Sequence, residues 1–377
     1  MGGVDKDPRL ANNGGAEFIE NQGVIKMKKT LKAAVALSVL TAPAYAANLE
    51  NPLYMPKQGA VYSKTSAGVM YKIADDSNAH QLKEHDGATE FPIWRFHEEL
   101  GYGILDNLEL YGKFGYTHDG DIDRKGMHLG RAGLKYRAVD TTDGFAWDIY
   151  ADAQLGGISE MSGSYAANGF KYDNYSNGRW GFHVGTQFGK QWSKFSAAAF
   201  VEALRTFGND NNSIEIKEID ASKAGFGVLD RTTLTALGFT DEISVDLKST
   251  TEINAGLKTF YQLDDRWSFG AGFTFKHHSD NGVEGLATDL NAPAVPTVAG
   301  LPAAAIQQAL VKGLLTQVED MEDGFDEYII SLSAAYQMTD TMQLAVYGEY
   351  TFDESHAQSQ NGTDVKAEMG VRLNVQF

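Results

Sequence analysis

Hydrophobic and polar residues alternate along the chain from about residue 64 to its C-terminus. In the segment 145–155, for example, Phe145 and Trp147 share one face, while Asp148 and Asp152 lie on the other. This period-2 pattern is typical of strands with one apolar face, and it recurs with turn residues between the repeats. We predict twelve strands, at 64–74, 92–104, 108–118, 127–139, 145–156, 179–190, 194–206, 249–263, 266–278, 326–338, 341–353 and 364–377.

The lengths and connections of these strands favour a membrane barrel over a soluble sandwich. Strands of about 10 to 14 residues exceed the roughly 5–6 usual in soluble proteins and suffice to cross a bilayer on a tilt. The connections alternate strictly between short ones, near 105–107, 140–144, 191–193, 264–265 and 339–340, and long ones, near 75–91, 119–126, 157–178, 207–248, 279–325 and 354–363. This alternation is typical of bacterial barrels. We predict an all-β fold: a transmembrane antiparallel up-and-down β-barrel of twelve strands with short periplasmic turns and long outer loops.

Aromatic residues gather at the ends of the predicted strands, as the two interfacial belts of a membrane barrel require. Beside the short turns stand Trp192, Trp267, Tyr102, Tyr136, Tyr261 and Tyr336. Near the long loops stand Trp94, Tyr116, Trp180, Tyr328 and Phe352.

The C-terminal segment 368–377 sets a glycine and then alternating hydrophobic residues before a final phenylalanine, with Gly370, Leu373, Val375 and Phe377 in the key positions. This ending resembles the C-terminal β-signal of Gram-negative outer-membrane proteins. The resemblance implies insertion by the outer-membrane barrel assembly machinery, which reads that strand. It covers the end of the chain and indicates no subfamily.

A short apolar run after a basic start, ending in the A-x-A pattern Ala44-Tyr45-Ala46, is typical of a secretory signal peptide cleaved after Ala46. The run is too short to span a bilayer as a helix, which needs about 20 apolar residues. We therefore expect an integral protein of the outer membrane, exported through the inner membrane. We divide the chain into a non-native upstream leader at 1–26, the signal peptide at 27–46, a periplasmic lead-in at 47–63 and the barrel at 64–377.

Composition narrows the range of partners. The net charge of −18 disfavours nucleic acid, and the absence of cysteine excludes disulfides and thiol chemistry. We expect no cofactor and no metal site. The expected partners are outer-membrane lipid and lipopolysaccharide, the assembly machinery and small hydrophilic solutes.

If the apolar faces contact lipid, the opposite faces line the lumen. The inward charges that we expect to line a channel are Arg95, Glu99, Glu109, Lys113, Arg131, Lys135, Asp148, Asp152, Glu252, Lys258, Lys366, Glu368 and Arg372, and the same register turns Arg137, His183, Glu202 and Glu349 inward. Such charges can set the selectivity of a narrow pore. Alternatively, they pair across the lumen and seal it, which would leave a structural or surface-interaction barrel. Glu98 does not fit, because strict alternation points it at lipid.

Two long loops carry further patterns. An apolar stripe that includes Ile306, Leu310 and Leu314 predicts a helix beginning near Leu301. It either folds inward as a constriction or caps the barrel mouth by packing on the 207–248 loop. Asp119, Asp121 and Asp123 resemble the start of a calcium loop, but Arg124 stands where such a loop needs glycine. A solvated acidic loop is the simpler interpretation, and loose binding of a divalent cation that bridges lipopolysaccharide is the alternative.

An enzyme is the remote alternative. The segment 174–178, Asn-Tyr-Ser-Asn-Gly, resembles the H-x-S-N-G pattern of outer-membrane phospholipases. Asn174 occupies the histidine position, so Ser176 lacks a base to activate it. His277 and His278 face opposite sides of one strand, which is poor geometry for a shared metal. We therefore expect no enzymatic activity and favour a porin-like channel.

Overall fold

The computed structural model describes residues 48–73, 92–119, 124–156, 161–162, 164–167, 170–173, 179–220, 228–240, 242–279, 283–287, 290–298, 300–320, 325–352 and 365–377. The predicted leader at 1–26 and signal peptide at 27–46 lie outside these residues, as do Asp121, Asp123 and the 174–178 segment. Those expectations stay predictions. No helix among the described residues is both long enough and apolar enough to cross a membrane.

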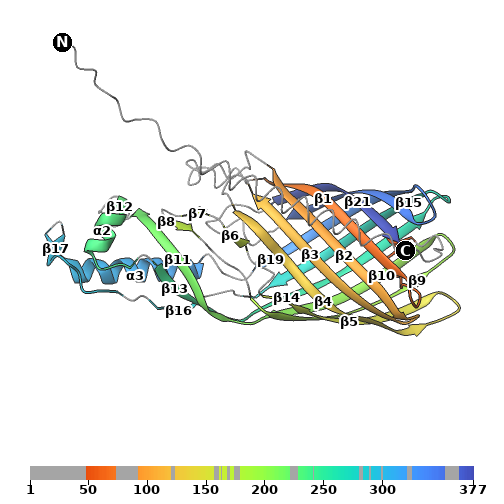
Figure 1. Ribbon diagram of the computed structural model, residues 1–377, viewed down its shortest axis with the longest axis horizontal. Coiled ribbons are helices and arrows are strands. Elements are labelled where there is room, and N and C mark those ends of the chain that lie inside the picture. Colours follow the sequence, from red (N-terminus) through yellow and green to blue (C-terminus); the bar gives the residue numbers. More distant parts are fainter. Residues whose placement is uncertain are drawn as a thin grey trace, which may run out of the picture. The chain divides into compact units, whose positions relative to one another are not determined.

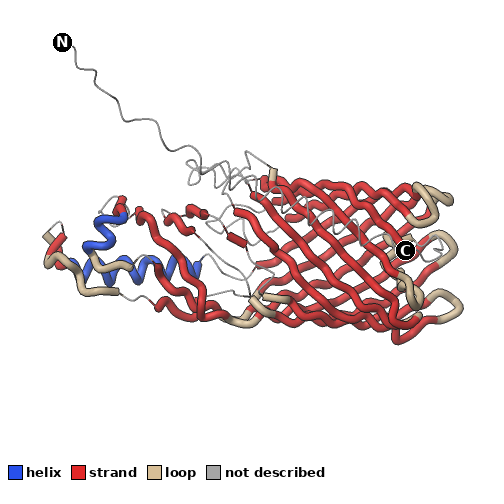
Figure 2. The backbone as a smooth tube through the Cα atoms, in the orientation of Figure 1, coloured by secondary structure: helices blue, strands red, loops and turns tan. Residues whose placement is uncertain are grey.

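Twelve strands within the described residues form a closed antiparallel barrel (Figures 1 and 2). They are β1 (Val61–Ile73), β2 (Ile93–Leu105), β3 (Leu108–Asp119), β4 (Arg124–Asp140), β5 (Phe145–Gln154), β9 (Gly181–Gln191), β10 (Phe195–Thr206), β14 (Thr250–Gln262), β15 (Trp267–His278), β19 (Phe325–Gln337), β20 (Met342–Phe352) and β21 (Val365–Gln376). Each strand pairs with the next in this order, and β1 pairs with β21 to close the ring. The predicted fold class is therefore confirmed.

The alternation of side chains separates an apolar outer face from a polar interior. Large hydrophobic residues remain exposed on the outside, such as Leu332 at 61% and Met369 at 58%. The alternate positions bury polar groups, including Asp148 at 0%, Glu109 at 1% and Asn374 at 0%. This distribution is the inverse of a soluble protein, and it is what a barrel surrounded by lipid requires.

The segments predicted as long loops contain structure of their own. A second antiparallel sheet has the order β16 (Val283–Ala287), β13 (Glu242–Leu247), β11 (Asn209–Asp220), β8 (Phe170–Asp173) and β7 (Ser164–Ala167). The smaller elements are β6 (Met161–Ser162), which pairs with β4, β12 (Val228–Asp230), which pairs with β11, and the pair formed by β17 (Thr297–Val298) and β18 (Leu301–Pro302). The segment 207–248, which was predicted as a long loop, therefore contains the strands β11 and β13.

The predicted loop helix is present as α3 (Ala303–Asp320), with Ile306 and Leu310 buried as expected. It lies against the 207–248 segment, where the short helix α2 (Arg231–Ala236) ends beside Gly238. The Gln307 side chain donates to the Asn291 carbonyl at 2.9 Å, and Asn291 in turn donates to the Gly238 carbonyl at 2.9 Å. Of the two packing arrangements left open by the sequence, contact with the 207–248 segment is the one observed.

Gly103 on β2 marks a close approach of the chain that precedes β1. A Cβ built at Gly103 would lie 2.1 Å from the carbonyl oxygen of Lys57. We expect Gly103→Ala to destabilise the barrel by about 1–3 kcal/mol, because overpacking forces the backbone to shift. The measurement is the urea midpoint of the heat-modifiable folded band on a gel. Gly348→Ala is the matched control, since its Cβ would meet only Glu368 O at 3.7 Å, and equal losses in both variants would contradict the prediction.

Candidate functional site in the barrel interior

Residues 48–56, here called the N-terminal segment, lie inside the barrel at the end that carries the short turns. Leu49, Leu53 and Pro56 are buried. The partners of the segment come from eight strands, namely β1, β4, β9, β10, β14, β15, β20 and β21. The segment therefore crosses the barrel at this end. The segment belongs to the predicted lead-in at 47–63, and its contacts with the barrel wall have no signal in the sequence.

Side chains of the segment anchor it to the barrel wall. Asn48 donates to Gln262 at 2.8 Å and to Ser268 at 3.2 Å. Glu50 accepts hydrogen bonds from Arg372 at 3.1 Å and from Asn374 at 2.8 Å. These contacts join the segment to β14, β15 and β21.

Backbone carbonyls of the same segment accept hydrogen bonds from the opposite wall. The carbonyl of Leu53 accepts from Arg137 at 2.7 Å, and that of Tyr54 accepts from Lys135 at 3.0 Å. The Leu53 side chain packs in a buried cluster with Ala146 and Ala198. Polar contacts and the apolar contact of Leu53 therefore both hold the segment in place.

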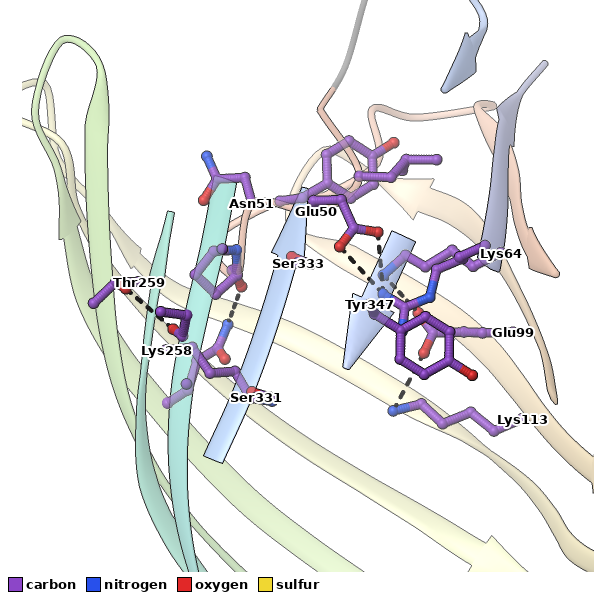
Figure 3. Close-up of a pocket in the computed structure, with 18 of the residues that line it drawn as sticks. Glu50, Asn51, Lys64, Glu99, Lys113, Lys258, Thr259, Ser331, Ser333 and Tyr347 are labelled. Atoms are coloured by element: carbon purple, nitrogen blue, oxygen red, sulfur yellow. Dashed lines mark hydrogen bonds and ion pairs between the residues drawn. The ribbon is translucent and has the colours of Figure 1, made fainter. Parts of the chain in front are cut away.

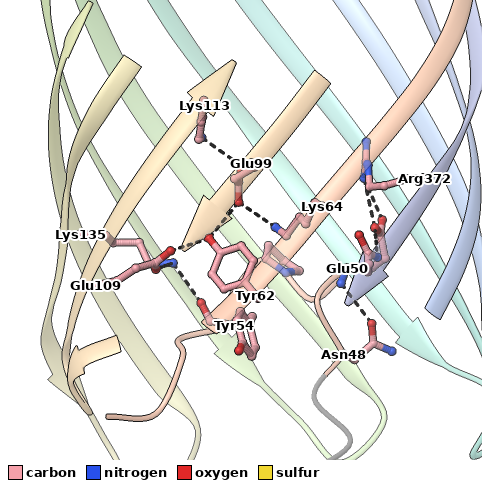
Figure 4. A network of polar contacts seen from close by, with 12 residues as sticks. Asn48, Glu50, Tyr54, Tyr62, Lys64, Glu99, Glu109, Lys113, Lys135 and Arg372 are labelled. Carbon is pink, nitrogen blue, oxygen red and sulfur yellow. Dashed lines mark hydrogen bonds and ion pairs between the residues drawn. The ribbon is translucent and has the colours of Figure 1, made fainter. Parts of the chain in front are cut away.

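A charged network lies next to the segment and extends into the lumen (Figure 4). Glu99 pairs with Lys64 at 3.1 Å and with Lys113 at 3.5 Å. The Tyr62 hydroxyl lies within hydrogen-bonding distance of both Glu99 and Glu109, and Lys135 pairs with Glu109 at 2.9 Å. Carboxylates and cations alternate along this network, so its charges largely compensate one another.

A second network surrounds His183 on β9. Its Nδ1 atom lies 2.6 Å from Asp152 Oδ2, and its Nε2 atom lies 3.5 Å from Glu202 Oε2. Hydroxyls support both carboxylates, because Tyr111 donates to Asp152 at 2.7 Å and Tyr150 donates to Glu202 at 2.9 Å. These tyrosines face inward by the same alternation as the charges, and the sequence reading had not singled them out.

Further ion pairs join strands that are adjacent or separated by one strand. Arg137 pairs with the fully buried Asp148 at 2.7 Å. Arg95 on β2 reaches Glu368 on β21 at 3.0 Å, and Lys276 on β15 lies 3.6 Å from Glu252 on β14. Within the described residues, no group of three or more histidine and carboxylate side chains could hold a metal ion.

A cavity of about 360 Å³ lies between the N-terminal segment and these networks (Figure 3). Leu49, Glu50, Asn51, Pro52 and Tyr54 of the segment line it. The other lining residues come from both walls, and among them are Lys64, Glu99, Glu109, Lys113, Lys135, Glu202, Lys258, Glu349 and Arg372. In the view of Figure 3, Lys258 and Ser331 stand on one side, and Glu99 and Lys113 stand on the other.

The cavity brings together part of the predicted set of lining charges. The members that line it are Glu99, Glu109, Lys113, Lys135, Lys258 and Arg372, while Arg95 and Glu368 line a neighbouring cavity. Arg131, Asp148, Asp152 and Glu252 take part in the ion pairs described above or in the His183 network. The side chain of Lys366 lies outside the described residues. Whether these groups line a solute path stays a prediction.

Glu98, which strict alternation points at lipid, is hydrogen-bonded to the neighbouring strand β1. Its two carboxylate oxygens accept hydrogen bonds from Ser63 at 2.6 Å and from Thr65 at 2.5 Å on the neighbouring strand β1. His277 and His278 have separate partners, Asp326 at 2.7 Å and Glu327 at 3.2 Å. The two histidines therefore contact different carboxylates.

The geometry defines the protein as a closed twelve-stranded barrel with an apolar exterior and a charged interior. No family model matches the chain, and no curated protein matches its sequence. Among solved structures, an outer-membrane channel from Pseudomonas putida F1 is similar, with 11% identity, coverage of 88% of this chain and 100% of the other, and a TM-score of 0.49. The Pseudomonas putida toluene transporter TodX gives 9% identity, 89% and 94% coverage, and a TM-score of 0.41. The transport unit of the Escherichia coli autotransporter AIDA-I gives 10% identity, 87% and 95% coverage, and 0.42. At these sequence identities and TM-scores, the similarities do not indicate what this chain does.

Proposed function

We propose that the chain is an integral outer-membrane channel through which small hydrophilic solutes diffuse. The observation that carries the proposal is the charged cavity of about 360 Å³ inside a closed barrel whose outer face is apolar. Polar walls favour hydrated solutes, and charged side chains in a narrow lumen select among them. The expected signal peptide, the reading of the last strand by the assembly machinery and contact with lipopolysaccharide belong to the same proposal.

A sealed barrel with a structural or surface role is the second candidate. The N-terminal segment favours it, because this segment is anchored to eight strands at the short-turn end. The pattern behind the enzyme alternative, at 174–178, lies outside the described residues, so that alternative stays as the sequence left it.

Single-channel recording in planar bilayers separates the two candidates. A channel gives discrete current steps that grow with the salt concentration. A sealed barrel gives no steps, although the same preparation shows the heat-modifiable migration of a folded barrel. Silence from a folded preparation would therefore overturn the channel proposal.

The anchor at Glu50 predicts a dependence of conductance on pH. Burial opposes ionisation of Glu50, but the Arg372 guanidinium and the Asn374 amide outweigh it and hold the pKa of Glu50 below its usual value of 4.5. A depressed pKa means that the anchor is fully present above pH 4.5 and is lost as pH falls through the lowered pKa. We expect conductance to rise in that acidic window, measured in bilayers buffered stepwise downward from neutral pH.

Glu50→Gln is the control for this rise. The variant cannot form the ion pair at any pH, so its conductance should already be raised at neutral pH and should lack the acidic step. An acidic step of the same size in the variant would assign the effect to other groups.

A further inference from the structure

One wall of the cavity is built from small residues. Gly270 and Gly272 on β15 stand beside Ser333 and Ser331 on β19, and we call these four residues the Gly/Ser panel. A Cβ built at Gly270 would lie 2.5 Å from Ser333 Oγ, and one at Gly272 would lie 2.5 Å from Ser331 Oγ. Each hydroxyl thus covers a glycine, and the short side chains leave room in the lumen in front of the panel.

Two opposite charges flank this panel on a single row across four strands. Lys258 on β14 pairs in register with Gly272, Gly272 with Ser331, and Ser331 with Glu349 on β20. With neighbouring strands about 4.8 Å apart, the Cα atoms of Lys258 and Glu349 are roughly 14 Å apart along the wall. Both side chains line the same cavity, and both are exposed within it.

Lys258 and Glu349 differ from the other lumen charges in their partners. Lys64 and Lys113 share Glu99, and Arg372 holds Glu50. Within the described part of the chain, by contrast, neither Lys258 nor Glu349 forms an ion pair with another residue.

The Lys258 ammonium has an aromatic neighbour instead. It lies 4.5 Å from the centroid of the Phe200 ring, and this contact supports the cation without neutralising it. The row therefore offers a solute one positive and one negative group, with a serine hydroxyl between them.

We propose that this row binds the two charged ends of a zwitterionic solute of the α-amino acid class. The proposal rests on the channel function proposed above and specifies its substrate class. The solute carboxylate faces Lys258, its ammonium faces Glu349, and Ser331 contributes a hydrogen bond between them. A simple anion would meet the repulsion of Glu349, and a simple cation would meet that of Lys258. The cavity is within the range of roughly 300–1,000 Å³ of small-molecule sites.

Liposome swelling tests the proposal with L-alanine as the zwitterion and glycerol as the neutral solute. In wild-type protein we expect alanine to enter faster than its diffusion relative to glycerol predicts. Lys258→Met and Glu349→Gln should each lower the alanine-to-glycerol ratio by about fivefold, the equilibrium factor for one charge contact at about 4 Å in water. The readout is the ratio, so a change that affects the entry of both solutes alike does not count as recognition.

Two further variants separate recognition from a structural effect. Lys194→Met, at an exposed turn where the ammonium donates to the Leu263 carbonyl at 2.8 Å, should leave the ratio unchanged. The double swap Lys258→Glu with Glu349→Lys reverses the pair but keeps it, so the preference for alanine should return. A disturbance of packing alone would not be reversed by the swap.

The outcomes distinguish this proposal from the channel function beneath it. If glycerol enters and the ratio is the same in wild type and both neutralised variants, the zwitterion proposal is wrong and the channel stands. If neither solute enters through folded barrels, the channel function is wrong and the zwitterion proposal falls with it.

Discussion

A chain that lacks residues 48–56 is expected to carry several-fold more current per channel than the intact chain. The segment occupies the short-turn end of the lumen, where its partners belong to eight of the twelve strands. Its removal widens the path below the cavity without touching a pairing of the barrel strands. The measurement is single-channel conductance in planar bilayers, with heat-modifiable migration as the check that the shortened chain folds.

A disulfide that holds the segment in place is the complementary test. Ser196 Oγ donates to Asn51 Oδ1 at 2.8 Å, and the chain has no cysteine of its own. The pair Asn51→Cys with Ser196→Cys can therefore form one bond only. Oxidised, it should conduct like wild type and should lose the acidic rise, and reduction should restore that rise. Equal conductance of the deleted and intact chains would mean that the segment does not obstruct the path.

The second large effect is expected from Asp148→Ala. Asp148 is fully buried and accepts from Arg137 at 2.7 Å and from Gln187 at 3.1 Å, while Arg137 also holds the Leu53 carbonyl. Removing one partner of such a pair leaves a buried charge uncompensated, which costs about 3–5 kcal/mol. We expect this loss in the urea midpoint of the folded band and in its melting temperature.

Two comparisons make the Asp148 result specific. Asp143→Ala removes the exposed pair with Lys190 at 2.8 Å and should leave the urea midpoint unchanged, because exposed pairs contribute little. The double variant Arg137→Met with Asp148→Leu removes both charges and should recover much of the stability that Asp148→Ala loses. A variant Asp148→Ala as stable as wild type would show that water compensates Arg137.

The strands could be predicted from the sequence because apolar and polar residues alternate within each strand. In β5, the alternation of Phe145 and Trp147 with Asp148 is complete within a few residues. The same alternation assigned the inward faces, where Glu109 and Asp148 are buried. Information of this kind is local, so one sequence suffices for it.

The N-terminal segment and the pairing of charges could not be predicted in this way. Asn48 and Glu50 show no periodicity, and their partners lie far along the chain, as with Glu50 and Asn374 at a separation of 324 residues. Whether Glu99 meets Lys64 or another cation depends on strand order and register. The strand β11, which was not predicted, differs from these cases. Its Ile214 and Ile216 alternate with charged residues, which is a short local signal of a strand.

The position of Glu50 has a consequence for the register in which the barrel closes. The pairing of β1 with β21 closes the barrel and joins the two barrel strands that are farthest apart in the sequence. In this pairing Ser66 lies opposite Arg372, and Lys64 lies opposite Asn374. Glu50 binds both of these β21 residues from the chain just before β1. A slip of this pairing by two residues would keep every side chain on its correct face, yet it would carry Arg372 and Asn374 away from Glu50. The contacts of Glu50 therefore favour the native register of the β1–β21 pairing over registers shifted by two residues.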